Sequence, residues 1–352
     1  MRILRATVTL ALLISPHAAL ACGGMVSESG GAELTGFEAL LRWDGDREEL
    51  VVSVGYTSGD PTFAWLMPLP SAPKVSEGDS DLITKAFQIT EPPQVEEAES
   101  EDEGAGAPPA VGGGVDVIGR DTVGGLRFVT LGGTNAGEVT RWMRKNSFAF
   151  HDRQEPVLQD YLDRDWVVVA ARGLQGNPGP ASLVPVRFRF RSSEPVYPLT
   201  MAGTGHEEQD LDVALFVLSP FRPTSTTYEE RIVRPTPSGE FPSPGRSLEI
   251  RYSAPLGDRA ASMQASPETW LTRYEATLNT RDLVTDIVLA PAANQSPVDY
   301  SDLGSAQSSR WILWTAIGIV LVVLAIVISL GMARRRRADE AARMPTQIPP
   351  AP

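Results

Sequence analysis

Short apolar runs and alternating apolar and polar positions recur along the chain, and both patterns are typical of β-strands. One segment alternates most cleanly, with an apolar face formed by Val184, Val186, Phe188 and Phe190. The segment 166–171 is apolar throughout, which predicts a central strand buried on both faces. We predict strands over residues 34–43, 49–56, 62–67, 116–118, 126–131, 166–171, 184–191, 211–218 and 247–252, and either a strand or a helix end over 282–289.

Other segments place their apolar residues at helical spacing. In one of them Thr134 or Asn135 can cap the helix, and Val139, Trp142 and Met143 form an apolar stripe. The predicted helices cover residues 79–87, 135–146, 155–164 and 268–278.

Antiparallel β segments with three to four packed helices predict an α+β fold, as one composite domain or two closely packed units. A change of composition marks the boundary between the two predicted parts of the ectodomain. Residues 91–103 hold seven acids and no base, and residues 104–114 are nearly all glycine, alanine or proline. Such a segment repels itself and buries little apolar surface. We therefore predict a disordered insert over 91–114, between a β-rich segment at 22–90 and the main α+β region at 115–291.

Both ends of the chain carry apolar segments with a targeting pattern. Residues 1–21 combine a basic start, a short apolar stretch and small residues at Ala19 and Ala21, which predicts a cleaved secretory signal. Residues 311–332 contain no charge and are long enough, as a helix, to span about 30 Å of hydrocarbon. We therefore predict a transmembrane helix there, with the lipid bilayer as its partner.

The residues that flank this apolar segment predict its orientation. Trp311 and Trp314 lie at one end, where aromatic rings prefer the membrane interface. The other end is followed by Arg334, Arg335, Arg336 and Arg337. Because basic residues stay in the cytoplasm, we predict a single-pass protein of the cell membrane. Its N-terminal ectodomain lies outside, residues 292–310 form a stalk, and residues 333–352 form a cytoplasmic tail.

The only cysteine, Cys22, follows the predicted cleavage point. A single cysteine excludes an intramolecular disulfide framework. Cys22 is a candidate attachment point, through a lipid or through a mixed disulfide with a partner, and an exposed free thiol is the alternative. Ala19 stands at the position where lipoprotein signals usually have leucine.

The charge of the chain excludes one class of partner and favours another. The formal net charge is −13, which argues against nucleic-acid binding because that requires a basic surface. Residues 22–310 carry 24 of the 31 basic residues and 42 of the 44 acidic ones, a net charge of −18. An acidic ectodomain favours basic partners.

Several short motifs occur together in the order that one bacterial family shows. They are residues 21–24, Tyr56 with 63–70, 139–143, 156–166, 195–199 and 270–274. Over residues 21–290 the chain resembles the DUF2330 family of uncharacterised exported bacterial proteins. The resemblance implies an exported, membrane-attached protein and implies no activity. Many members carry a second cysteine shortly after the first, whereas this chain has Met25, Val26 and Ser27 there.

Residue types needed for common catalytic sites are scarce or scattered. The predicted mature chain has two histidines, His151 and His206, too few for a three-histidine zinc site. It has no Gly-x-Ser-x-Gly motif. We expect no cofactor and no metal site. Acidic residues are plentiful, so an enzyme that uses paired carboxylates remains an alternative.

A row of arginines is the other candidate contact. Arg187, Arg189 and Arg191 share the polar face of one predicted strand, where like charges repel unless acids or a ligand neutralise them. They are candidates for contact with an anionic ligand or a partner's acidic patch. Pairing with acids on neighbouring strands is the alternative.

These inferences predict a single-pass cell-envelope protein whose ectodomain is a non-catalytic binding or scaffold domain with a protein partner in the envelope. The alternative is a surface hydrolase that acts on envelope polymer through carboxylates about 5–9 Å apart.

Overall fold

The structure is a computed structural model, and it describes residues 24–27, 32–58, 63–92, 117–148, 150–173, 179–204, 208–236 and 239–300. Cys22, the predicted signal at 1–21, most of the insert, the membrane segment at 311–332 and the tail lie outside these residues. The described residues up to Val298 belong to one compact unit. Among the described residues, no helix combines the length and apolar character needed to cross a membrane.

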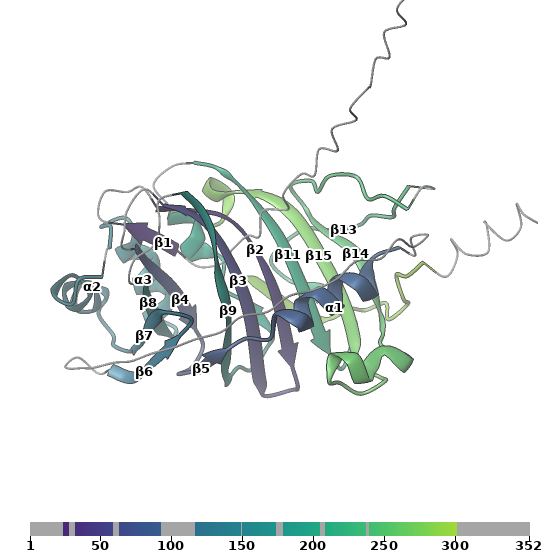
Figure 1. Ribbon diagram of the computed structural model, residues 1–352, viewed down its shortest axis with the longest axis horizontal. Coiled ribbons are helices and arrows are strands. Elements are labelled where there is room, and N and C mark those ends of the chain that lie inside the picture. The colour runs from purple at the N-terminus through teal and green to yellow at the C-terminus, as the bar shows by residue number, and fades with distance from the viewer. Residues whose placement is uncertain are drawn as a thin grey trace, which may run out of the picture. The chain divides into compact units, whose positions relative to one another are not determined.

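The smaller sheet has five antiparallel strands in the order β1–β4–β8–β7–β6 (Figure 1). They are β1 (Gly24–Ser27), β4 (Phe63–Leu69), β8 (Val167–Gly173), β7 (Leu126–Leu131) and β6 (Val117–Val123). The prediction of a central strand over 166–171 is confirmed, because β8 lies between β4 and β7 and its first five side chains are buried. Pro68 lies within β4 but beyond the end of β1, so among the described residues the strand has a ladder neighbour on one side only at that point.

A two-glycine turn joins β6 to β7. Gly124 and Gly125 have φ values of +55° and +76°, the left-handed backbone that a tight hairpin requires. A Cβ atom at Gly124 would lie 1.7 Å from Cγ2 of Val184, so this position has no room for a side chain.

The larger sheet has eight strands in the order β13–β14–β15–β11–β2–β3–β9–β5. They are β13 (Glu230–Ile232), β14 (Leu248–Pro255), β15 (Trp270–Asn279), β11 (Asp210–Ser219), β2 (Ala32–Trp43), β3 (Arg47–Ser58), β9 (Gly179–Arg191) and β5 (Lys74–Glu77). Two pairs, β2 with β11 and β13 with β14, are parallel, and the others are antiparallel. Strands from both sides of the insert share both sheets, so the two predicted segments build one composite domain.

The predicted helix over 268–278 is wrong, because these residues form β15 between β11 and β14. The positions of Trp270, Leu271 and Tyr274 fit a helix, but the polar residues between them are not exposed. Thr272 is buried on the inner face of the sheet, the face of Tyr274, and Arg273 is buried on the outer face. A strand with both faces covered loses the alternation that identifies it in the sequence.

The polar side of β14 and β15 is an ion-pair network. Arg251 is fully buried, with Nη2 at 2.7 Å from Oε2 of Glu249 and Nε at 3.3 Å from Oε2 of Glu275. Arg273 donates from Nε to Glu275 at 2.8 Å. The guanidinium of Arg251 also lies 4.7 Å from the ring of Phe241. Each buried charge therefore has an opposite partner, as burial requires.

A bulge changes one face of β9. Val186, Phe188 and Phe190 face the core as predicted, but Val184 is 40% exposed. Between β3 and β9 the register passes from Val52↔Val186 to Val54↔Leu183, so β9 holds one extra residue there. An extra residue reverses the side-chain alternation beyond it.

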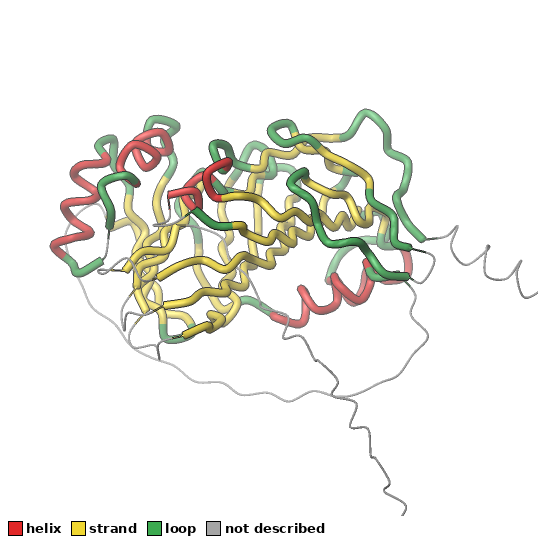
Figure 2. The backbone as a smooth tube through the Cα atoms, turned by 90° about the horizontal axis from the view of Figure 1, so that it is seen from above, coloured by secondary structure: helices red, strands yellow, loops and turns green. Residues whose placement is uncertain are grey.

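Helices cover the outer faces of the two sheets (Figures 1 and 2). Those on the small sheet are α2 (Ala136–Lys145) and α3 (Gln154–Leu162), and α1 (Ser80–Thr90) lies on the large sheet, with η2 (Gly257–Met263) beside it. The predicted cap is confirmed, since Asn135 accepts from the backbone N–H of Glu138 at 3.1 Å. The inner faces of the two sheets share one apolar core. Strands and helices together confirm the α+β class.

A three-stranded sheet, β10–β16–β12, completes the described part. Its strands are β10 (Val196–Tyr197), β16 (Ile287–Pro291) and β12 (Pro223–Ser225), and the short helices η1 (Thr200–Thr204) and η3 (Thr280–Asp282) lie nearby in the chain. The first residues of the predicted stalk pack on the domain. Ser253 of β14 and Val298 exchange two backbone hydrogen bonds of 2.7 and 2.6 Å. Val298 is buried as a result.

Candidate functional site

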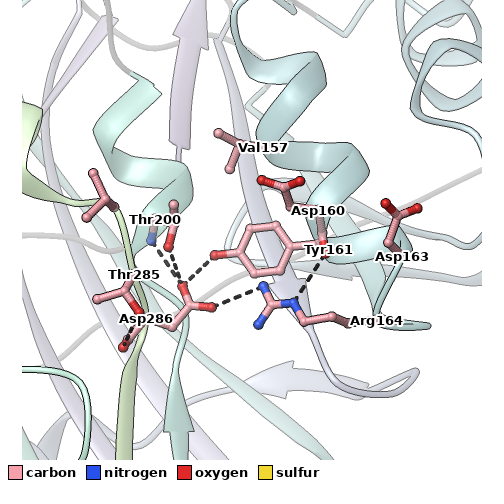
Figure 3. Close-up of a pocket in the computed structure, with 9 residues that line it drawn as sticks. Val157, Asp160, Tyr161, Asp163, Arg164, Thr200, Thr285 and Asp286 are labelled. Atoms are coloured by element: carbon pink, nitrogen blue, oxygen red, sulfur yellow. Dashed lines mark hydrogen bonds and ion pairs between the residues drawn. The ribbon is translucent and has the colours of Figure 1, made fainter.

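A hollow of about 320 Å³ lies where α3, η1 and the residues just before β16 meet (Figure 3). Its lining is mostly polar and contains three aspartates and one arginine. The lining residues are Val157, Asp160, Tyr161, Asp163, Arg164, Thr200, Val284, Thr285 and Asp286.

Asp286 forms the floor of the hollow and is 3% exposed. Its Oδ1 accepts the Tyr161 hydroxyl at 2.5 Å, the Thr200 hydroxyl at 2.9 Å, and the backbone N–H groups of Leu199 and Thr200 at 2.9 and 3.1 Å. Its Oδ2 lies 3.4 Å from Nη2 of Arg164. Both carboxylate oxygens therefore have donors, and these come from two separate parts of the chain, residues 161–164 and residues 199–200.

The wall of the hollow is built by one turn of α3 and the residues after it. Tyr161 and Arg164 are three residues apart, which places them on the same side of a helical turn. The guanidinium of Arg164 lies 4.6 Å from the ring of Tyr161 and 4.4 Å from that of Trp166. Arg164 also donates to the backbone carbonyl of Asp160 at 3.2 Å. These contacts hold Arg164 across the carboxylate of Asp286.

Burial sets the protonation of the tyrosine. The Tyr161 side chain is 1% exposed, and burial raises its pKa well above 10, with the negative charge of Asp286 and the hydrogen bond to it adding to the shift. Tyr161 thus remains a hydrogen-bond donor at neutral pH.

The rim of the hollow is open and acidic. Asp160 and Asp163 are exposed, and Asp163 accepts from Gln159 at 2.6 Å. Val284, which also lines the hollow, is 80% exposed. Figure 3 shows both rim carboxylates on α3 and its C-terminal end, apart from the bonded cluster around Asp286. A positively charged group with an apolar stem matches this rim.

The chemistry of the hollow favours binding. A carboxylate that works as an acid or a base needs an available oxygen, and both oxygens of Asp286 are already bonded, so Asp286 is unsuited to that role. Within the described residues, no group of three His, Cys, Asp or Glu side chains is arranged to hold a metal ion.

The sequence prediction missed this site. The segment 156–166, which contains Tyr161 and Arg164, supports the family resemblance, but nothing in the sequence connects it to Asp286. The motif at 156–166 was therefore the only feature of the sequence that pointed toward this site.

The predicted arginine row lies elsewhere, on the outer face of the large sheet. Arg187 and Arg189 both contact Glu49 on β3, with Arg187 Nε at 3.6 Å from Oε1 and Arg189 pairing with Oε2. The backbone of Arg191 exchanges hydrogen bonds with the hydroxyl of Ser71. Cys22 and the residues predicted to flank the membrane lie outside the described residues.

A second buried acid, Glu48, has a different environment from Asp286. It is fully buried, and its Oε2 accepts only the N–H of Val196, at 2.9 Å. Its Oε1 has no hydrogen-bond partner among the described residues. Burial raises the pKa of Glu48 well above its usual 4.5, and the bond from Val196 opposes this only in part.

The fold and the hollow define a β-rich α+β domain with an acidic depression of about 320 Å³ on its described surface. Residues 16–289 match the family described as "Uncharacterized protein conserved in bacteria (DUF2330)", and the chain belongs to this family. The resemblance found in the sequence is thereby confirmed.

Comparison with curated proteins finds no match. Among solved structures, the crystal structure of baculovirus P35 is similar at a TM-score of 0.39 and 10% identity, over 77% of this chain and 100% of that one. A mutated baculovirus P35 after caspase cleavage has a TM-score of 0.31 and 10% identity, over 72% and 97%. Likenesses this distant assign no function to the chain.

Proposed function

We propose that this protein is a single-pass cell-envelope protein with a non-catalytic binding ectodomain. Residues 1–21 are its signal, residues 311–332 its membrane helix, and residues 333–352 its cytoplasmic tail. The ectodomain binds a partner protein in the envelope, and the hollow above Asp286 receives a lysine or arginine side chain of that partner.

One observation carries this proposal: the buried carboxylate is fully bonded while the rim carboxylates are open. Asp286 accepts four hydrogen bonds and forms one ion pair. These contacts hold the walls of the hollow together, so Asp286 has a structural role. The carboxylates of Asp160 and Asp163 remain available to the positive charge of a lysine or arginine. Val157 and Val284 can contact the apolar part of the same side chain. The acidic composition of the ectodomain supports a basic partner.

Zero-length carbodiimide cross-linking in intact cells tests the proposal, because it joins a carboxylate to a lysine amine in direct contact. We expect mass spectrometry to find Asp160 or Asp163 joined to a lysine of one recurring envelope protein. Asp160→Asn with Asp163→Asn should abolish that product. Asp258→Asn, an exposed acid on η2, is the matched control and should leave it unchanged.

Two results would contradict the proposal. One is a cross-link that survives loss of both rim aspartates, which places the contact elsewhere. The other is recovery of the full chain outside the membrane fraction, which contradicts the anchor. The alternative of a hydrolase gains support instead if the purified chain cleaves envelope polymer and the double variant does not.

A further inference from the structure

Three arginines of β9 form a straight row on the outer face of the large sheet. Arg187, Arg189 and Arg191 occupy alternate positions, and the residues between them are buried in the core. Alternate residues on one face of a strand are about 6.6–6.8 Å apart, so the row is about 13 Å long.

One carboxylate, that of Glu49, forms ion pairs with two of the three arginines. Glu49 is opposite Arg189 on β3 and contacts both Arg189 and Arg187. Arg42, opposite Glu49 on β2, donates instead to the backbone carbonyls of Met263 and Gln264, at 2.7 Å each.

The charges around Glu49 are unbalanced. Burial lowers the pKa of Arg42; the charge of Glu49 opposes that shift, and the charges of Arg187 and Arg189 add to it. The Nε atom of Arg187 is buried without a hydrogen-bond partner in the described part of the chain. Two guanidinium groups therefore pair with one carboxylate and a third lies within reach of their charges, and a further anion would relieve the repulsion among them.

At the outer end of the row two arginines are cross-strand neighbours. Arg191 is opposite another arginine, Arg47, on β3. No ion pair of the Arg191 side chain is found within the described ranges. Lys74, on β5, is opposite Arg189 and adds a further positive charge to this face. The charge of Lys74 also interacts with Asp121 on β6.

We propose that Arg187, Arg189 and Arg191 bind an extended acidic peptide of a partner protein, in which every second residue is Asp or Glu. An extended peptide presents alternate side chains on one side at the spacing of the row itself. Each guanidinium offers a planar fork that matches a carboxylate. Glu49 occupies part of two forks and competes with the peptide. This site uses none of the residues of the hollow and does not depend on the function proposed for it.

Fluorescence anisotropy tests the inference directly. The probe is a labelled peptide that alternates Glu with Thr, added to the full-length protein in detergent. A peptide of the same composition with its Glu residues in one block tests spacing, and a peptide with Gln in place of Glu tests charge. We expect the alternating peptide to bind most tightly, and its affinity to fall as salt rises.

Variants assign the binding to the row. Arg191→Gln should weaken the alternating peptide about tenfold, because a charge-assisted bond is lost. Arg246→Gln removes an arginine that is 65% exposed and pairs with Asp210, and it should bind as the wild type does. Glu49→Gln should bind more tightly, because it removes the competing carboxylate. Circular dichroism and the unfolding midpoint establish that each variant is folded.

Three results would overturn the inference. One is equal binding of the alternating and block peptides, and another is equal binding of inorganic polyphosphate, because either reduces the site to non-specific charge attraction. The third is a folded Arg191→Gln variant with unchanged affinity. A folded Glu49→Gln variant that binds more weakly contradicts the proposed competition.

Discussion

Tyr161 and Asp286 are 125 residues apart in the chain, and the hydroxyl of Tyr161 donates to Oδ1 of Asp286 over 2.5 Å. This bond joins α3, which covers the small sheet, to the residue before β16, which belongs to the three-stranded sheet. It therefore connects two parts of the core as well as shaping the hollow.

Loss of this bond should destabilise the fold. Tyr161→Phe removes one donor from a buried carboxylate, and hydrogen bonds to charged groups contribute about 1.5–3 kcal/mol. We expect a loss of about 2 kcal/mol in the free energy of unfolding, measured with urea. Tyr228→Phe is the control, because Tyr228 donates to a neutral carbonyl, that of Thr285, at 2.9 Å. Its loss should be near 1 kcal/mol; a larger loss in the control than in Tyr161→Phe would contradict the role of Asp286.

Glu48 predicts a stability that falls as pH rises. Its pKa in the folded chain is raised by burial, so the folded state holds this proton more tightly than the unfolded state does. This contribution to stability is fully present below the unfolded pKa of 4.5 and is lost as pH rises through the folded pKa. Glu48→Gln keeps the acceptor for Val196 and cannot ionise.

The measurement is the difference in unfolding free energy between Glu48→Gln and the wild type, from pH 4 to pH 9. We expect the difference to shift in favour of Glu48→Gln as pH rises. Glu91→Gln, at an exposed position, should show no such trend. A constant difference for Glu48→Gln would show that this carboxyl ionises equally in both states.

The buried network on β14 and β15 predicts a large cost for removing its centre. Arg251→Met leaves Glu249, which is 1% exposed, without its buried partner, and breaking a buried pair costs about 3–5 kcal/mol. Arg246→Ala removes an exposed pair with Asp210 and should cost less than about 1 kcal/mol. Comparable unfolding midpoints for the two variants would contradict the importance of the network.

The turn between β6 and β7 separates steric cost from backbone cost. Gly125→Ala meets no atom within 4 Å and should cost about 1 kcal/mol through its positive φ alone. Gly124→Ala adds a collision with Val184 and should cost more. Val184→Ala should recover part of that additional loss in a double-variant cycle of thermal unfolding midpoints. Purely additive effects would exclude the contact.

The sequence correctly predicts those elements that have one apolar face toward the core or a recognisable helix cap. The strands over 126–131 and 211–218 and the helix that begins after Asn135 have clear apolar faces or caps, and the structure contains them. The prediction for the segment around Tyr274 fails because Arg273 and Glu275 look solvent-exposed in the sequence. The groups that cover them come from other elements: Glu275 pairs with Arg251 on β14, and the guanidinium of Arg273 lies 4.8 Å from the ring of Phe87 on α1.

The candidate site is less predictable for a related reason. Four donors reach Asp286 from Tyr161, Leu199 and Thr200, none of which is near it in the chain. Nothing local to Asp286 distinguishes it from the other acids of an acidic protein. The arginine row was visible because its three members lie on one strand, whereas its carboxylate, Glu49, lies 140 residues before Arg189.

The parallel pair of β2 and β11 has a consequence for how the chain acquires its fold. Gly36 and Asp212 are partners in this ladder, so the first long hairpin lacks its neighbour until more than half of the chain has been made. Such distant pairing makes folding slow and leaves strand edges open to other chains in the meantime. The nascent protein therefore needs protection from aggregation until β11 and β15 are available, and its large sheet assembles only after synthesis has passed residue 279.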